Sequence, residues 1–177
     1  YNEKNIFLRK AKVTNHGEST EHIKLFFHQV FSIYGTPQED TAYYDPNKNV
    51  LIHYEGRRMF LIYAETSDLP FDEYSVGLYG IEGKEGTYKD AEDGVLSKNS
   101  IEHGHVDSAC GVSLTLHKGE TKEVCYWVTV GETKGEVYEL HEYVLYRRPD
   151  SLIESTDKFW HAWLTRQDYI TCDVKDD

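Results

Sequence analysis

The sequence predicts a mainly β protein, an antiparallel β-sandwich followed by one or two C-terminal helices. Up to about residue 132, short segments alternate apolar and polar side chains with the period of two that a strand requires. Turn-forming residues separate these segments at short intervals, and beyond residue 132 the apolar residues recur at helical spacing. Many short strands joined by turns favour a sandwich over a parallel sheet. We therefore expect a sandwich over residues 1–132 and a helical segment over residues 133–177.

Eight segments carry the strand pattern. They are residues 5–14, 21–34, 41–44, 50–54, 58–64, 74–79, 109–117 and 122–130. In the first, Phe7, Ala11 and Val13 share one face, which predicts a strand with one apolar side. The last two segments are expected to form a hairpin, because Gly119 lies in the short turn between them.

The segment after residue 132 begins with a helix start signal. Thr133 and Glu136 have the spacing of a capping box, and Pro149 is expected to end the first helix. The apolar residues of this helix are Val137, Leu140, Val144 and Leu145.

A second helix is expected to begin near Ser151 or Ser155. It carries Leu152, Phe159, Trp160, Trp163 and Leu164. Two tryptophans are too much apolar surface to leave in water, at roughly 150 to 250 Å² each. They are expected to dock either on the sandwich or on another domain, and the sequence favours neither alternative.

Length and charge restrict the class of protein. A chain of 177 residues is long enough for one sizeable core, so one domain is the default. The 31 acidic against 19 basic residues repel nucleic-acid phosphates and anionic membrane surfaces, and no run of eighteen apolar residues occurs. We therefore expect no nucleic-acid and no membrane partner.

Cysteine usage indicates the compartment. The chain has three cysteines, Cys110, Cys125 and Cys172, which is an odd and sparse set. The predicted hairpin would place Cys110 and Cys125 on opposite faces, so a disulfide between them is not expected. Reduced thiols predict an intracellular, cytoplasmic protein.

Residues 90–108 read as a long, specific loop between two strand patterns. Asp90, Glu92 and Asp93 precede a glycine, as carboxylates do in half of a calcium loop. The twelfth position of such a loop needs a glutamate, and Ile101 stands there. The favoured interpretation is that these carboxylates bond to backbone amides and fix the loop.

The same loop contains two other candidate pairs. His103 and His105 could present two imidazoles to a transition metal, but no third ligand is identifiable, and solvent-exposed loop histidines are the favoured interpretation. Glu92 and Asp107 could supply the two carboxylates of a glycoside hydrolase, but with 31 acidic residues many such pairs can be drawn. We assign no catalytic residue, no metal site and no cofactor.

Several motifs together resemble a known family. They are LRKAKVTNHGE, KLFFHQVFSIYGT, DTAYYDPNKNVLIHYEGRRMFLIY, DAEDG, the triplet Val106-Asp107-Ser108 and CYWVTVGET, and they extend over nearly the whole chain. In this order they resemble the N-terminal β-sandwich domain of glycoside hydrolase family 15, the glucoamylase, glucodextranase and microbial trehalase group. The resemblance implies a supersandwich with an architecture like that of galactose mutarotase.

The resemblance also implies a role. In this family the two catalytic glutamates lie in an (α/α) barrel that follows the sandwich, and none of the positions singled out above matches them. The resemblance therefore implies a non-catalytic domain of a hydrolase of α-glucans or trehalose. Its partner would be the barrel of the same polypeptide, and the loop with Asp90, Glu92, Asp93, His103, His105 and Asp107 would face the interdomain region or the cleft.

Two alternative functions stay open. The chain could be a free-standing carbohydrate-binding module that uses Tyr43, Tyr44 and Trp127, although Trp127 alternates with Cys125 and Thr129 in a way that predicts burial. An aldose-mutarotase-like enzyme is an analogy of architecture alone. Family domains begin with further strands, so an exposed sheet edge and a homodimer are also expected.

Overall fold

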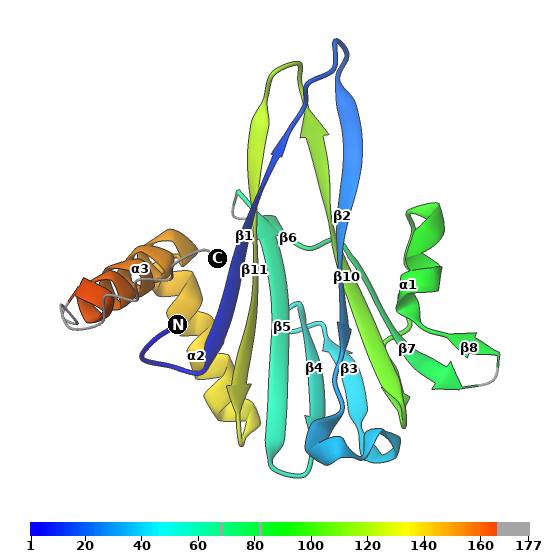
Figure 1. Cartoon of the computed structure of the whole chain (residues 1–177). Coiled ribbons are helices and arrows are strands. Elements are labelled where there is room, and N and C mark those ends of the chain that lie inside the picture. The colour runs from blue at the N-terminus through cyan, green and yellow to red at the C-terminus, as the bar shows by residue number, and fades with distance from the viewer. Residues whose placement is uncertain (68, 82, 166–177) are drawn as a thin grey trace, which may run out of the picture.

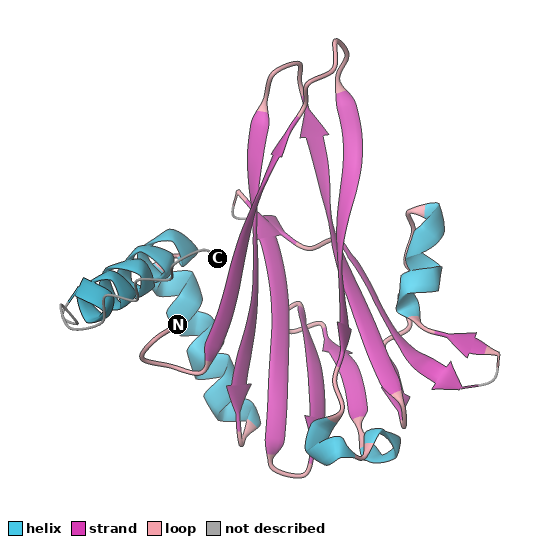
Figure 2. Cartoon of the chain, in the orientation of Figure 1, coloured by secondary structure: helices cyan, strands magenta, loops and turns pink. Residues whose placement is uncertain are grey.

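The computed structural model describes residues 1–67, 69–81 and 83–165, and it confirms the antiparallel β-sandwich. Two sheets face each other, and helices lie on the outer side of each (Figures 1 and 2). The predicted division at residues 132 and 133 stays a prediction. The described part of the C-terminal segment is helical, and Cys172 lies outside the described residues.

The elements have the following bounds. The strands are β1 (Ile6–Thr14), β2 (Glu21–Val30), β3 (Thr41–Asp45), β4 (Val50–Glu55), β5 (Arg58–Thr66), β6 (Leu69–Pro70), β7 (Glu73–Ile81), β8 (Lys84–Glu85), β9 (Ile101–His103), β10 (Val106–Leu116) and β11 (Thr121–Gly131). The helices are α1 (Thr87–Asp90), α2 (Lys134–Arg147) and α3 (Pro149–Thr165), with 3-10 turns at Ile33–Gly35, Pro37–Glu39 and Ala91–Asp93.

The two sheets have different orders. In the described part of the chain, sheet A has the order β1-β11-β5-β4-β3-β9, with β6 beside β5, and sheet B has the order β2-β10-β7-β8. All the pairings are antiparallel. Strands β1 and β2 stand at the ends of their sheets, as expected for exposed edges.

The predicted hairpin of residues 109–117 and 122–130 is wrong. The two strands β10 and β11 follow each other in the chain but belong to different sheets. The turn at Gly119, whose φ is 73°, carries the chain from one sheet to the other. Side-chain alternation alone cannot separate such a crossing from a hairpin, because both connect two strands through a short turn.

A second crossing, from β1 to β2, lies beside the first and is bonded to it. The amide of Gly119 donates to the carbonyl of Asn15 at 2.9 Å, and the amide of Asn15 donates to the carbonyl of Glu120 at 3.0 Å. The buried side chain of Asn15 donates to the carbonyls of Ser19 and Leu116 at 2.8 and 3.0 Å. Asn15 therefore holds both crossings together at one end of the sandwich.

Replacing Asn15 by Ala should lower the free energy of unfolding by about 2 to 3 kcal/mol, because it leaves the carbonyl of Leu116 without its buried donor. Chemical denaturation would measure this loss. The exposed neighbour His16, changed to Ala, is the matched control and should shift stability by less than about 0.5 kcal/mol. Equal effects of the two substitutions would contradict the role given to Asn15.

Strand β2 is shorter than predicted, because it ends at Val30 and not at residue 34. Residues 33–39 turn through two 3-10 segments, and Tyr34 takes a positive φ of 55°. The carboxylate of Asp40 accepts a hydrogen bond from the amide of Ile33 at 3.2 Å, which draws the chain back toward β3. Ile33 stays buried, and Phe31 before it stacks on Phe60 with ring centroids 4.5 Å apart, whereas Tyr34 is exposed.

Helix α2 covers the outer face of sheet A. Thr133 caps its start by accepting a hydrogen bond from the amide of Glu136 at 3.2 Å, as predicted. The carboxylate of Glu136 accepts from the amide of Glu132 at 2.7 Å, which extends the capping box by one residue. Trp127 is fully buried, as predicted, and donates its indole N–H to Nδ1 of His141 at 3.2 Å.

Burial keeps two histidines neutral in the folded protein. It lowers the pKa of His141 to about 4 and that of His53 to about 3, from an ordinary value of 6.5. His141 accepts from Trp127, and His53 has Nε2 2.7 Å from the hydroxyl of Ser108 between the sheets. Below pH 6.5 the unfolded chain takes up protons that the folded chain does not, so these histidines make the fold acid-sensitive.

The contribution of His141 to stability should be complete above pH 6.5 and fall by up to about 3 kcal/mol as the pH drops to 4. A His141→Gln variant keeps a hydrogen-bond acceptor for Trp127 but does not titrate. Unfolding free energies measured between pH 7.5 and 4.5 should therefore fall less steeply for this variant than for the wild type. The exposed His16→Gln control should keep the wild-type slope, and a wild-type slope in the His141 variant would refute the assignment.

The start of helix α3 differs from the prediction. The helix begins at Pro149 and not at Ser151 or Ser155, and α2 ends at Arg147. Proline fits the first turn of a helix because its missing N–H has no intrahelical partner there. Of the described residues of α3, Pro149 and Leu152 are buried, and the far end of the helix projects from the body (Figure 1).

Candidate functional site

The three carboxylates that suggested half of a calcium loop hold their own loop instead. Asp90 accepts a hydrogen bond from the amide of Ser97 at 2.8 Å, and Asp93 accepts from the amide of Val95 at 2.9 Å. Glu92 pairs with Lys89 at 2.7 Å on the surface. The bonds of Asp90 and Asp93 are those of the favoured interpretation, in which carboxylates bond to backbone amides, whereas Glu92 pairs with a lysine side chain instead.

The region of residues 90–108 is more regular than predicted. It contains the end of α1, a 3-10 turn and strand β9, and Val106, Asp107 and Ser108 belong to β10 and not to a loop. The segment of residues 94–100 lies beside β7, where Asn99 brackets Val76. The amide of Val76 donates to the carbonyl of Asn99 at 2.9 Å, and the side-chain amide of Asn99 donates to the carbonyl of Val76 at 2.8 Å.

The two histidines of this region face different partners. Nδ1 of His103 lies 2.9 Å from the hydroxyl of Thr41, while the ring of His105 packs against Tyr79 with centroids 5.9 Å apart. Among residues 1–67, 69–81 and 83–165, no group of three or more His, Cys, Asp or Glu side chains is placed to hold a metal ion.

Asp107 is the centre of the most organised polar cluster. Its carboxylate is fully buried on the outer face of sheet B, under α1. Oδ2 accepts hydrogen bonds from the amide and the hydroxyl of Thr87, at 2.5 and 2.9 Å, and from Nε2 of His28 at 2.8 Å. Oδ1 is buried and has no hydrogen-bond partner. The cluster therefore joins three segments that are far apart in the sequence.

Glycines make room for this cluster. A Cβ added at Gly77 would lie 2.8 Å from Oδ1 of Asp107, and one added at Gly86 would lie 2.6 Å from Oδ2 and 2.9 Å from the ring of Tyr79. Gly86 also has a positive φ of 103°, which side chains disfavour. A side chain at Gly77 or Gly86 would therefore collide with the carboxylate of Asp107.

Four rings are joined by successive ring contacts beside this cluster, and we call Tyr88, His28, Tyr79 and His105 the ring row. Successive ring centroids are 5.9, 6.4 and 5.9 Å apart. Tyr88 is 46% exposed and Tyr79 is 36% exposed, so both rings reach solvent. His105 and Asp107 stand out in the sequence, but His28, Tyr79 and Tyr88 do not, since only the pairing of β2, β10 and β7 brings them together.

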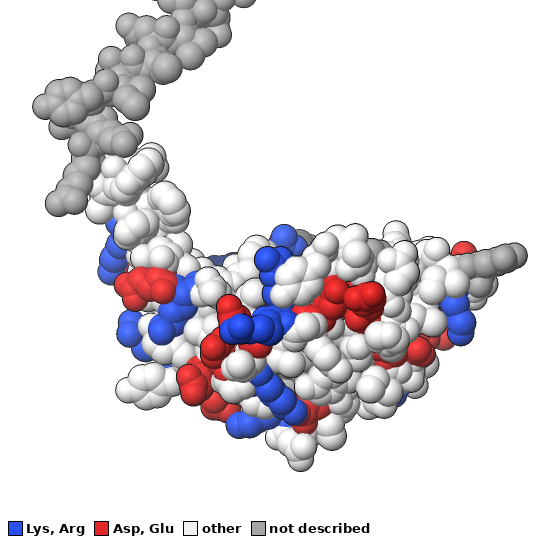
Figure 3. Space-filling model, turned by 90° about the horizontal axis from the view of Figure 1, so that it is seen from below, with Lys and Arg blue, Asp and Glu red and all other residues white. Residues whose placement is uncertain are grey.

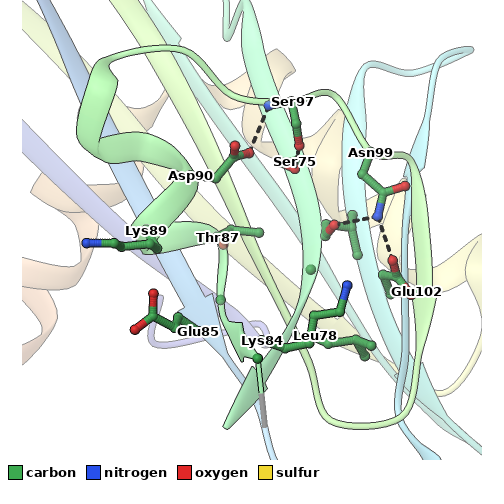
Figure 4. A pocket seen from close by; sticks show the side chains of 14 residues that line it. Ser75, Leu78, Lys84, Glu85, Thr87, Lys89, Asp90, Ser97, Asn99 and Glu102 are labelled. Carbon is green, nitrogen blue, oxygen red and sulfur yellow. Dashed lines mark hydrogen bonds between the residues drawn. The ribbon is translucent and has the colours of Figure 1, made fainter. Parts of the chain in front are cut away.

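A polar pocket lies next to the cluster and shares Gly86 and Thr87 with it. Its volume is about 380 Å³. Figure 4 shows side chains from β7, β8, α1 and the segment of residues 97–102 around it, among them Ser75, Lys84, Asn99 and Glu102. Hydroxyl, amide, ammonium and carboxylate groups are all present, so the pocket suits a small polar ligand.

A second pair of carboxylates lies at the opposite end of the sandwich from Asn15. Oδ1 of Asp40 and Oε2 of Glu55 are both buried without a hydrogen-bond partner. Burial raises the pKa of Asp40 to about 6, the nearby Glu55 adds to the rise, and the amide of Ile33 and His105 oppose it. Asp40 therefore holds a proton more tightly in the folded than in the unfolded chain.

The contribution of Asp40 to stability should be complete below pH 3.8 and be lost as the pH rises through about 6, a change of about 2 kcal/mol. An Asp40→Asn variant keeps an acceptor for the amide of Ile33 and offers Glu55 a permanent donor. It should be more stable than the wild type at pH 8, and this advantage should shrink at pH 5. Denaturation at both values measures the difference, with the exposed Glu39→Gln as control. A constant advantage at both pH values would contradict the shifted pKa.

The aromatic residues considered for a binding module lie elsewhere. Tyr44 stacks on Tyr74 with centroids 3.7 Å apart, Tyr43 is half-buried beside Tyr54, and Trp127 is covered by α2. Cys110 and Cys125 are free thiols, as predicted. The reason differs from the predicted one, because the two residues lie in different sheets and not on two faces of a hairpin.

Comparison with known proteins identifies a solved structure with a similar fold. No protein-family model and no curated protein sequence matches the chain. A crystal structure of a bacterial glucoamylase complexed with acarbose is similar to this chain, with a TM-score of 0.62 and 13% sequence identity over 90% of this chain and 25% of that chain. The chain shares the fold of a part of that glucoamylase. The predicted resemblance is therefore confirmed at the level of fold, and the chain spans about a quarter of the length of the protein it matches.

Acidic and basic side chains are interspersed on the face seen from below (Figure 3). Within the described ranges, no helix has both the length and the apolarity needed to cross a membrane.

Proposed function

We propose that this chain is a non-catalytic N-terminal domain of a glucoamylase-like glycoside hydrolase that acts on α-glucans or trehalose. In this proposal the sandwich supports a catalytic (α/α) barrel of the same polypeptide, and the region of residues 90–108 helps to shape the cleft. The similarity of fold supports it, because it extends over 90% of this chain and over only 25% of the glucoamylase chain. Such coverage, nearly complete for the short chain and partial for the long one, is expected when the short chain corresponds to one domain of a longer protein.

The observation that carries the proposal is the uncovered apolar surface of α3. Its exposed apolar side chains are Ile153, Phe159, Trp160, Trp163 and Leu164. Trp160 and Trp163 are 49% and 48% exposed and contact each other edge to face, with centroids 5.7 Å apart. So much exposed aromatic surface on one short helix marks an interaction site.

A cleft continues this surface toward the sandwich. It has a volume of about 340 Å³ and is lined by Tyr1, Leu8, Leu152, Ile153 and Trp160, among others. The first turns of α3 pack on the body through Leu152, and within residues 1–165 as described the apolar side chains of the remaining turns stay exposed. Of the two alternatives that the sequence left open, docking on another domain is the one proposed here for the tryptophans, because Leu152 is buried while Trp160 and Trp163 stay about half exposed.

The proposal gives no catalytic role to the carboxylates of this chain. Glu92 is paired on the surface and Asp107 is buried under α1, so the two have separate local partners. A homodimer through the edge strands, a cytoplasmic location and the domain boundaries at residues 1–132 and 133–177 stay predictions.

The native polypeptide should be several-fold heavier than 20.6 kDa when it is detected in its source cells with an antibody raised against this chain. Extracts that contain the heavy band should release glucose from α-glucans or trehalose, and depletion with the antibody should remove that activity. A native band near 20.6 kDa would overturn the proposal, since the sandwich would then act without a barrel.

Changing both Trp160 and Trp163 to Ala should shift the unfolding free energy of the isolated chain by less than about 0.5 kcal/mol, because neither ring is buried in it. In the complete polypeptide the same double change should lower the thermal midpoint, because both rings would lose their contacts with the barrel. Leu152→Ala is the control, since it removes a buried side chain and should cost about 2 to 4 kcal/mol in the isolated chain. An unchanged midpoint in the complete polypeptide would contradict docking through α3.

A further inference from the structure

The ring row on the outer face of sheet B has no role in the docking of α3. Its members come from β2, β7, α1 and the turn before β10, and one of them, His28, bonds to the buried carboxylate of Asp107. Structural packing alone does not require a carboxylate there, and a buried carboxylate with one bare oxygen is costly. The arrangement is that of a prepared binding surface.

We propose that the ring row binds a neutral sugar chain. The choice of an α-glucan as that chain rests on the proposed function, whereas the choice of a neutral sugar rests on the chemistry of the row. Tyrosine rings offer flat apolar faces to the C–H faces of a pyranose, and imidazole nitrogens exchange hydrogen bonds with its hydroxyls. Alternating rings of these two kinds, about 6 Å apart, suit a ligand that is amphipathic along its whole length.

The hydrogen bond to Asp107 determines which ring nitrogen of His28 remains for a ligand. Because Nε2 is engaged by the carboxylate, Nδ1 is the ring nitrogen left to bond a sugar hydroxyl. The hydrogen bonds from Thr87 fix the carboxylate, so the orientation of the ring is set before a ligand arrives. Asp107 is therefore a positioning residue and does not itself contact the ligand.

Charge favours a neutral ligand over an acidic one. The carboxylate of Asp107 bonds to His28 of the row, and the chain has a formal charge of -12, so an acidic polysaccharide would be repelled. The adjacent pocket extends the surface with polar groups, because Ser75, Asn99 and Glu102 line it and Thr87 belongs to both. A chain of sugars lying on the rings can reach these groups with its hydroxyls.

Glycines keep the row in place. Gly86 fits between Asp107 and the ring of Tyr79, and a Cβ added at Gly80 would lie 3.3 Å from the ring of His105. Both glycines have a positive φ, 103° and 70°, so a side chain is disfavoured at either position. Tyr79 and His105 thus pack closely against glycine backbone.

The test is saturation-transfer NMR on this chain with maltotriose as the probe. Transfer to the sugar should be present for the wild type. Tyr88→Ala, which removes an exposed ring, should weaken binding by about threefold to tenfold. Tyr146→Ala is the matched control, because Tyr146 is an 84% exposed tyrosine on α2 and should leave binding unchanged. A trimer of galacturonic acid should show no transfer.

A second variant separates positioning from simple contact. His28→Ala should weaken binding as Tyr88→Ala does, whereas His28→Gln, which keeps a side-chain acceptor, should recover part of the loss. Near-ultraviolet circular dichroism would show that each variant is folded.

Three results would overturn the proposal. They are no transfer to maltotriose from the folded wild type, an equal loss in the Tyr88 and Tyr146 variants, and binding of the galacturonic acid trimer as strong as that of maltotriose. None of these depends on a barrel, so the sugar site can fail while a heavy native polypeptide still supports the proposed function, and the reverse also holds.

Discussion

Sheet A is apolar on both faces, and this constraint arranges the rest of the molecule. Neighbouring residues of β5, such as Leu61 and Ile62, point to opposite faces and are both fully buried. Sheet B covers one face, and α2 covers the other through contacts with β11 and β5. Trp127 belongs to the covered outer face, where its N–H needs a partner and finds His141. Because α2 completes this cover, α3 has little left to pack on and keeps its aromatic side chains in solvent.

The sequence allowed the strands and the first helix to be predicted, since both are local patterns. The alternation in β1 and the capping pair Thr133 and Glu136 act within a few residues of each other, and the structure contains both. The errors occur where a distant contact decides the local conformation. The bonds between Asn15 and Gly119 join two crossings that look like hairpins, and the bond from Ile33 to Asp40 ends β2 early. Neither partner can be identified from the pattern of its own segment.

The candidate site was less accessible to sequence reasoning than the fold. Asp107 was named for its type and His105 for its spacing from His103, but their real neighbours come from other strands. His28 is 79 residues from Asp107 and meets it only because β2 pairs with β10. Gly77 gives no signal in the sequence, although it faces Asp107 across β7 and β10 and leaves the space for its carboxylate. A site built by strand pairing becomes visible only with the pairing.

The central claim is that α3 is an interface with the remainder of a longer polypeptide. The most direct measurement is hydroxyl-radical footprinting of Trp160 and Trp163, in the isolated chain and in the native polypeptide, with the 84% exposed Tyr146 as internal reference. The account predicts strong labelling of both tryptophans in the isolated chain and protection of both in the native polypeptide, while Tyr146 is labelled alike in the two. Equal labelling of the tryptophans in both forms would contradict the claim.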